Sequence, residues 1–237
     1  MKHIRKRGMP REYKVWWDLV RGTPQEHYHE LQNPEKRILH SKLIEEQGKL
    51  CAYTMKRIDL VSSHIEHVKP ETLCRAELVG SDLDYENLVA CFPREGMKKG
   101  HRYGAQMKGA WWENDGADFI SPLHPSCEKR FQFHLDGCVS AVKNHVGAKK
   151  TIEVLKLNHD SLIDDRKRII SEFLYGPNGD DPLPPAKALQ AKAIIGSLQD
   201  SEGGFYEFCI AIHHALDAHQ KNLQKAARQR KFARKKS

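Results

Sequence analysis

The first fifty residues carry a hydrophobic pattern that predicts two helices. Between residues 11 and 21 the apolar positions recur at helical spacing. A second run with this spacing opens after Asn33 and Pro34 and stops at Gly48, a residue type that commonly follows the last turn of a helix. We therefore expect an N-terminal helical region.

The pattern changes after residue 50. Residues 50–60 form a short apolar run that contains Tyr and Thr, and Pro70 ends the run that begins at Ser62. Short runs bounded by proline predict strands or loops, so we expect a small two-stranded element in this stretch. Residues 82–92 are predicted to form a loop that leads into one or two helical turns starting at Glu86.

The second half of the chain alternates irregular and helical patterns. Glycine and lysine residues predict a loop over 96–109, and mixed aromatic, proline and glycine residues predict irregular structure with short strands over 111–139. Apolar spacing predicts two helices within 148–174, joined near 158–161. The run GPNGDDPLPP at 176–185 breaks the chain before a final helical region that starts at Ala186 and is interrupted at 201–204.

The composition is that of an ordinary globular protein with an excess of positive charge. The 237 residues are 39% hydrophobic and 30% charged, with a formal charge of +8 and a pI near 9.1. This balance argues against bulk disorder and favours nucleic acid or another polyanion as a partner. Residues 224–237 carry seven Lys or Arg and no acidic residue, which indicates either a solvated tail or an arm that binds phosphate groups.

Length and pattern together predict four parts. These are an N-terminal helical region (1–49), a central domain (50–140), a C-terminal helical region (141–223) and a basic tail (224–237). The six Cys are not preceded by a signal peptide, so we expect free thiols in a cytoplasmic protein. No apolar run approaches the length of a membrane span, and we expect no membrane partner.

The residues best suited to catalysis cluster at His64, Glu66 and His67, with Asn87 twenty residues later. Successive residues of a strand point to opposite sides, so the three clustered side chains share a pocket only where the backbone bends, as Pro70 favours. Phosphodiester hydrolysis needs a base for water and a cation for the charge at phosphorus, and these side chains could supply the base and ligands for the cation. The alternative is that they are surface polar residues, with one histidine hydrogen-bonded in the core.

Several motifs, taken in order, resemble the HNH endonucleases. Their pattern of acid, His, hydrophobic residue, any residue and Pro, followed by Asn-Leu, matches EHVKP at 66–70 and NL at 87–88. More narrowly, LHSKLIEEQGKLCAYTM, SHIEHVKP, NLVACF, SPLHPSCEKRF and LKLNH resemble the PtuB nuclease subunits of Septu-type and retron-linked anti-phage systems, over about residues 35–170. The resemblance implies an α+β fold in which a ββα-metal HNH nuclease unit is embedded between N-terminal and C-terminal helical regions.

The HNH resemblance also implies roles for the clustered side chains. Glu66 takes the place of the metal-binding acid, and His67 that of the general base. Asn87 takes the place of the Asn that holds either the metal or the loop carrying the base. His64 has no settled place in the pattern; it either orients a ligand or is the base itself in a different register.

Two further features of the family are less well matched. HNH proteins commonly support the hairpin with zinc bound by two pairs of Cys, but Thr54 stands where the partner of Cys51 is expected, so we expect no four-cysteine zinc site. A mixed site of Cys51, Cys91 and His101 is the alternative. The third residue of the HNH pattern, a His or Asn, would fall on Ala105, and His101 is the nearest histidine.

The glycine- and lysine-rich loop supplies the predicted contacts with nucleic acid. Lys98, Lys99, Arg102 and Lys108 carry the positive charge that would hold the phosphate backbone. His101 is either a further phosphate contact or an ordinary loop histidine.

The resemblance implies a function and partners as well. We expect an endonuclease that uses Mg²⁺ or Mn²⁺ to cleave DNA or RNA and acts as the effector, or toxin, subunit of a bacterial anti-phage complex. A PtuA-like ATPase is the implied partner, with a retron reverse transcriptase and its RNA-DNA product in retron systems. No GxxxxGK[ST] motif is present in this chain, so any ATP dependence would come from that partner. The alternative is a catalytically degenerate HNH subunit that binds nucleic acid or supports assembly.

Overall fold

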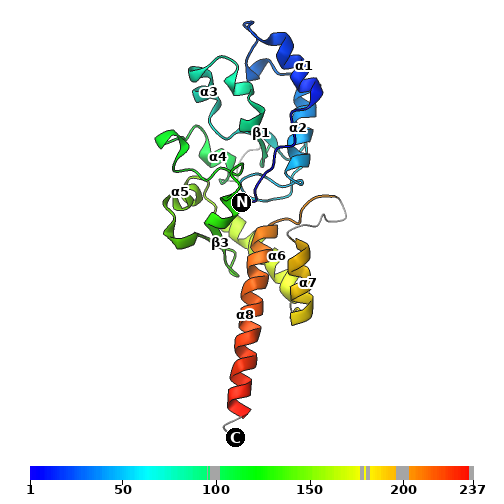
Figure 1. The fold of residues 1–237 in the computed structure, drawn as a ribbon, viewed down its shortest axis with the longest axis vertical. Coiled ribbons are helices and arrows are strands. Elements are labelled where there is room, and N and C mark those ends of the chain that lie inside the picture. The colour runs from blue at the N-terminus through cyan, green and yellow to red at the C-terminus, as the bar shows by residue number, and fades with distance from the viewer. Residues whose placement is uncertain (95, 97–101, 177–178, 180–181, 196–202, 235–237) are drawn as a thin grey trace.

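The computed structural model describes residues 1–94, 96, 102–176, 179, 182–195 and 203–234. Its helices are α1 (Arg11–Val20), α2 (Glu35–Glu46), α3 (Glu71–Glu77), α4 (Ala105–Lys108), α5 (Val146–Val154), α6 (Asp160–Tyr175), α7 (Pro185–Ile195) and α8 (Cys209–Arg234). Its strands are β1 (His64–His67), β2 (Leu88–Cys91), β3 (Phe131–Phe133) and β4 (Val139–Ala141). Helices therefore surround two small antiparallel sheets, an α+β arrangement (Figure 1).

The two N-terminal helices confirm the prediction from apolar spacing. α2 buries Leu39 and Leu43 on one face, and α1 packs against α2. Tyr13 of α1 is fully buried, and its hydroxyl donates a 2.6 Å hydrogen bond to the carbonyl oxygen of Leu83. This bond ties the N-terminal helices to the segment that precedes β2.

The central hairpin differs from the prediction. β1 pairs with β2, with His64 opposite Cys91 and His67 opposite Leu88, whereas residues 50–60 contribute an isolated bridge between Leu50 and Arg57. The expected helical turns from Glu86 are wrong: a single 3-10 turn, η3 (Tyr85–Asn87), leads directly into a strand. The side chain of Gln47 explains the strand, because it bonds both the N–H and the C=O of Ala90 on the edge that β1 leaves open.

The region after the hairpin follows the sequence pattern except at α4, a helix within the loop predicted over 96–109. Residues 111–139 contain turns and the strand β3, which pairs with β4, and two helices follow, joined at residues 155–159. Arg166 of α6 is fully buried and donates hydrogen bonds to the carbonyl oxygens of Gly137 and Leu157. Both carbonyl groups lie in turns, where no sheet or helix supplies a hydrogen-bond donor. The guanidinium of Arg166 supplies these donors instead.

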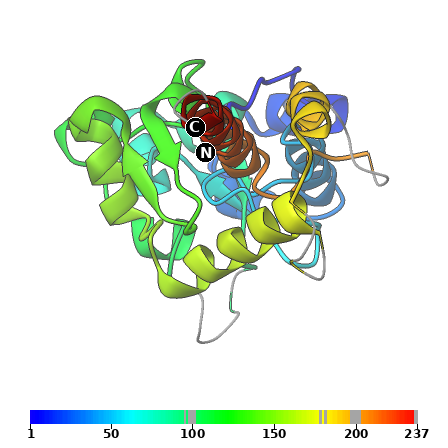
Figure 2. The same cartoon turned by 90° about the horizontal axis from the view of Figure 1, so that it is seen from below.

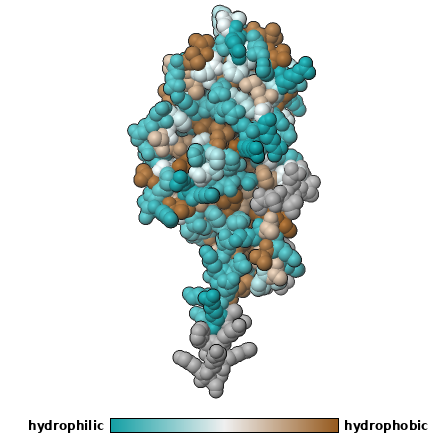
Figure 3. All heavy atoms as spheres, in the orientation of Figure 1, coloured by the Kyte–Doolittle hydropathy of each residue, from teal (hydrophilic) through white to brown (hydrophobic). Residues whose placement is uncertain are grey.

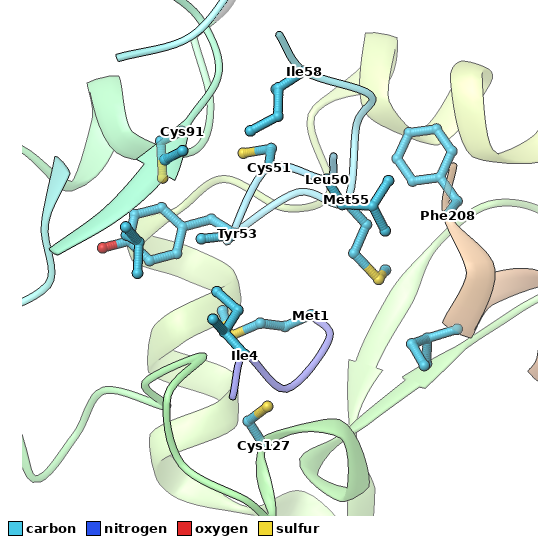
Figure 4. Packing of buried hydrophobic residues seen from close by; sticks show 14 of the residues in the cluster. Met1, Ile4, Leu50, Cys51, Tyr53, Met55, Ile58, Cys91, Cys127 and Phe208 are labelled. Atoms are coloured by element: carbon cyan, nitrogen blue, oxygen red, sulfur yellow. The ribbon is translucent and has the colours of Figure 1, made fainter. Parts of the chain in front are cut away.

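The hydrophobic core joins the two halves of the chain. Figure 4 shows Met1 and Ile4 packed between the loop that carries Leu50, Cys51 and Met55 on one side and Cys127 on the other. Phe208, at the start of α8, is completely buried in the same cluster. The core thus fixes the loop before β1 against both the N-terminal segment and the base of α8.

The last helix replaces the expected separate tail. α8 continues to Arg234, so the basic residues between Leu223 and that end extend a helix that packs at its base on α6, α7 and β3 and then projects from the body (Figures 1 and 2). The coloured part of the projection in Figure 3 is largely hydrophilic, and Lys221, Lys225 and Arg228 are exposed on it. In the part of the chain that is described, no helix is both long and apolar enough to cross a membrane.

His214 in α8 predicts how stability changes with pH. Burial, with His213 nearby, lowers the pKa of His214 to about 4, and its Nδ1 accepts a hydrogen bond from the N–H of Phe133. Since the unfolded histidine binds a proton below its ordinary pKa of 6.5, stability is lost as the pH falls from 6.5 towards 4. We expect His214→Asn, which keeps an acceptor but cannot titrate, to lose less stability over this range.

The measurement is urea unfolding at several pH values between 7.5 and 4. His134→Asn is the control, because His134 is exposed and bonds the hydroxyl of Ser140. Equal acid sensitivity of wild type and His214→Asn would contradict the buried neutral state of His214.

Candidate active site

Glu66 lies between two basic side chains. Its Oε1 is 3.1 Å from the Nζ of Lys108 in α4, and its Oε2 is 3.6 Å from the Nε2 of His64 on the same side of β1. Lys108 is 2% exposed, and its ammonium also donates a 3.0 Å hydrogen bond to the carbonyl oxygen of His67. The short helix α4 is thereby held against the end of β1.

His64 has its tautomer set by the backbone. Its Nδ1 lies 2.5 Å from the carbonyl oxygen of Pro93. A carbonyl oxygen can only accept, so Nδ1 carries the proton and, in the neutral ring, the lone pair is on Nε2. The Nε2 that faces Glu66 is therefore a potential ligand for a cation.

His67 is held in the complementary tautomer. Its Nε2 donates a 2.8 Å hydrogen bond to the carbonyl oxygen of Asp82, and the ring packs edge-on against Tyr28 with centroids 4.7 Å apart. The carboxylate of Asp82 accepts the N–H of Tyr28 at 2.8 Å, so Asp82 fixes both rings. Burial lowers the pKa of His67. Burial thus favours the neutral ring, in which the lone pair lies on Nδ1.

Asn87 uses its whole side chain to hold the turn after β1. Its Oδ1 accepts the N–H of Lys69 at 2.8 Å, and its Nδ2 donates to the carbonyl oxygen of Lys69 at 2.9 Å and to the sulfur of Cys74 at 3.4 Å. The backbone of Asn87 also accepts the N–H of Val68. Asn87 therefore fixes the backbone immediately after His67.

Glu66 and His67 open into one pocket although they alternate along a strand. The pocket has a volume of about 290 Å³ and is lined by β1, Tyr28, the start of α3 and the residues just after α4. His67 is the last residue of β1, where the chain turns towards Pro70. The bend expected from Pro70 thus brings the acid and the histidine to the same opening.

Comparison with known proteins gives one informative relative. The chain is 30% identical over 146 residues to a protein of Vibrio cholerae serotype O1 biovar El Tor named "Retron Vc95 putative HNH endonuclease". The match covers 59% of this chain and 67% of the relative. This chain belongs to the HNH endonuclease family. No family model matches it.

Glu66 and His64 are the side chains of the site that face each other and could hold a divalent ion, whereas the sequence predicts Glu66 and Asn87 as the ligands. Asn87 was expected to join Glu66, but both ends of its amide are occupied by Lys69. His64 instead presents Nε2 to Glu66. Among the described residues, no group of three or more His, Cys, Asp or Glu could hold a metal, so an ion here would depend on water and substrate for its other ligands. Mg²⁺ is commonly bound in this way.

Cys51 and Cys91, the two cysteines of the alternative zinc site, are buried and hydrogen-bonded to each other. Cys51 and Cys91 are 1% and 0% exposed, and the sulfur of Cys51 accepts the N–H of Phe92 at 3.3 Å. Burial raises the pKa of Cys51, but hydrogen bonds from Cys91, Thr54 and the backbone outweigh it and lower the pKa to about 6. Protein donors thus satisfy the Cys51 sulfur. His101, the third residue of the alternative zinc site, lies outside the described residues.

The predicted contacts with nucleic acid divide into three groups. Lys98 and Lys99 lie outside the described residues, and Arg102 is exposed. Lys108 does not lie on the surface where a phosphate contact was expected. It is buried against Glu66 because α4 begins at Ala105, the position proposed for the third HNH residue, and directs the lysine inwards.

No pattern in the sequence points to the residues that hold His67 in place. Asp82 and Tyr28 are distant from His67 along the chain, and their roles depend on contacts with the backbone. Asp82 lies in an acidic, polar run that resembles an ordinary loop. A cationic partner for Glu66 could have been suspected, because a partly buried carboxylate, here with 17% of the side chain exposed, favours one.

The role of Asn87 can be tested by stability. We expect Asn87→Ala to lower the free energy of unfolding by about 1–3 kcal/mol, because it leaves the N–H and C=O of Lys69 without their partner. Asn87→Asp keeps the acceptor for the N–H and should lose less. Asn222→Ala, an exposed position on α8, is the control.

Urea unfolding in EDTA separates this role from metal binding. A residue that acted only as a metal ligand would leave the stability of the metal-free protein almost unchanged. An unaltered unfolding midpoint for Asn87→Ala would therefore contradict the role in holding the turn.

Proposed function

We propose that this chain is a metal-dependent endonuclease that hydrolyses phosphodiester bonds in nucleic acid, with β1, β2 and α4 as its ββα-metal unit. Membership of the HNH family supports the reaction class. The observation that carries the proposal is the fixed tautomer of His67, whose Nδ1 lone pair belongs to a neutral ring beside Glu66. A general base needs this combination of neutrality, orientation and access.

The side chains divide the chemistry between them. His67 removes a proton from the attacking water at Nδ1, and the carbonyl oxygen of Asp82 stabilises the imidazolium that forms. Glu66 and His64 would hold a divalent ion, Mg²⁺ or Mn²⁺, which would polarise the scissile phosphate. Asn87 keeps the turn after His67 in place, so that the base does not have to be ordered during the reaction.

We further propose a role in anti-phage defence. The Vibrio cholerae relative is named as a retron component, and the motifs that resemble PtuB extend this to an effector subunit. A PtuA-like ATPase and a retron reverse transcriptase with its RNA-DNA product are the partners to test. Co-purification from cells that express each candidate with this chain would identify them.

One observation favours a second function. Lys108 neutralises part of the charge of Glu66, which weakens a site that has only two metal ligands among the described residues. An HNH subunit that binds nucleic acid without cutting it would show this arrangement. The two functions differ in whether the purified chain, with or without its partner, cleaves DNA or RNA in Mg²⁺ or Mn²⁺.

His67→Ala tests the catalytic proposal. We expect the cleavage rate to fall by roughly 10²–10⁴-fold, because a positioned general base contributes about that much, and we expect EDTA to abolish cleavage by the wild type. His134→Ala, at an exposed histidine outside the site, should cleave like the wild type. Equal rates for His67→Ala and wild type would refute the assignment of His67.

A further inference from the structure

A second, larger cavity borders the proposed catalytic pocket. Its volume is about 460 Å³, and it shares Tyr28, His64 and Ile65 with the smaller pocket. One wall is α2, another is the loop that leads into β1, and Arg94, just after β2, completes the lining. A molecule bound in this cavity would therefore lie next to Glu66 and His67.

The charge of this cavity is entirely positive. Lys36 and Arg37 of α2 and Arg94 line it, and no Asp or Glu is among the described residues that line it. Within the described chain, none of these three cations has an acidic partner; Lys36 lies over the ring of Tyr28 at 4.8 Å. Unpaired cations that converge on a concave surface favour an anionic ligand.

The inner wall of the cavity is polar but neutral. The Nε2 of His40 lies 2.9 Å from the hydroxyl of Ser63, which donates in turn to the carbonyl oxygen of Asp59. Ser63 thus accepts from His40, which fixes the ring. Burial lowers the pKa of His40 to about 4, with His64 and Lys36 adding to the effect. The cavity therefore combines three cations with the neutral ring of His40. Such a lining suits a ligand in which a phosphate is joined to a less polar group.

We propose that this cavity, bounded by Lys36, Arg37, His40 and Arg94, binds an unpaired nucleotide adjacent to the phosphate that is cleaved. The proposal rests on the nuclease function and names its substrate class: nucleic acid that is single-stranded, or has a displaced nucleotide, at the cut. A volume of about 460 Å³ is in the range of pockets that enclose small ligands. In a duplex the base is stacked and paired, so its nucleotide cannot enter the cavity.

Binding to the non-cleaving protein tests the cavity without relying on catalysis. The full chain carrying His67→Ala would be titrated against fluorescent 20-mers of single-stranded DNA, single-stranded RNA and duplex DNA, with anisotropy as the readout. The test variant adds Lys36→Gln and Arg37→Gln. The control adds Lys149→Gln and Lys167→Gln, which remove the same charge from exposed positions on α5 and α6.

We expect the cavity variant to bind single strands about 10–100-fold more weakly, with a change of less than about threefold for the control. The logarithm of the single-strand binding constant falls linearly with the logarithm of the salt concentration. Two lost phosphate contacts should make this slope shallower by about 1.4, since each contact contributes about 0.7. Duplex affinity should change no more than in the control. The DNA and RNA arms show which sugar the cavity accepts.

Further variants keep the result interpretable. Arg94→Gln removes a cation from a different element and should also weaken single-strand binding, whereas exchanging Lys36 and Arg37 for each other should preserve it. Equal weakening by the cavity and control variants, or an equal loss of duplex binding, would overturn the proposal. If the cavity variants bind single strands more weakly but the wild type does not cleave, the nuclease function alone is refuted. If the wild type cleaves but the cavity variants bind single strands as before, this inference alone is refuted.

Discussion

The contacts of the Lys108 ammonium are the constraint on which the site depends. This buried group bonds the carboxylate of Glu66 and the backbone of His67, two neighbours that point to opposite sides of β1. It joins the acid, the end of the strand and α4 in one network. A buried ammonium that lost these acceptors would be strongly unfavourable, so the network holds α4 and the hairpin in one arrangement.

Backbone carbonyl groups decide how the two histidines can act. Pro93 fixes the proton of His64 on Nδ1, and Asp82 fixes that of His67 on Nε2. The lone pairs therefore lie on different ring nitrogens of residues only three apart. Under the proposed function, this difference makes His64 a metal ligand and His67 the general base. Sequence spacing alone does not distinguish the two roles.

The sequence predicted helices better than sheet pairing, for a physical reason. The helices α1, α2, α5 and α6 show their periodicity locally, whereas the partner of β1 lies more than twenty residues away. Residues 88–91 are buried on both faces and so lack the alternation that marks a strand exposed on one side. Local reasoning consequently assigned them to a helix, and Gln47, which binds this strand, gave no sequence signal.

The residues of the site also divide into those that the sequence predicts and those that it does not. The motif EHVKP predicts Glu66 and His67 as site residues, because their chemistry and adjacency are visible in the sequence. The sequence leaves the role of Asn87 open between metal ligand and loop anchor, and in the structure its amide bonds the backbone of Lys69. Asp82 and Tyr28 could not be predicted, since their contribution comes from backbone groups that any residue type carries.

The pairing of Glu66 with Lys108 also determines how metal and substrate would act together. An acid already paired with an ammonium attracts a divalent ion less strongly, and His64 adds only a neutral ligand. A bound phosphate would supply both the missing oxygen ligands and the missing negative charge. Each would then increase the affinity for the other, because coupling between two ligands is reciprocal. Under the proposed function, the ion would be held firmly only when nucleic acid is in place.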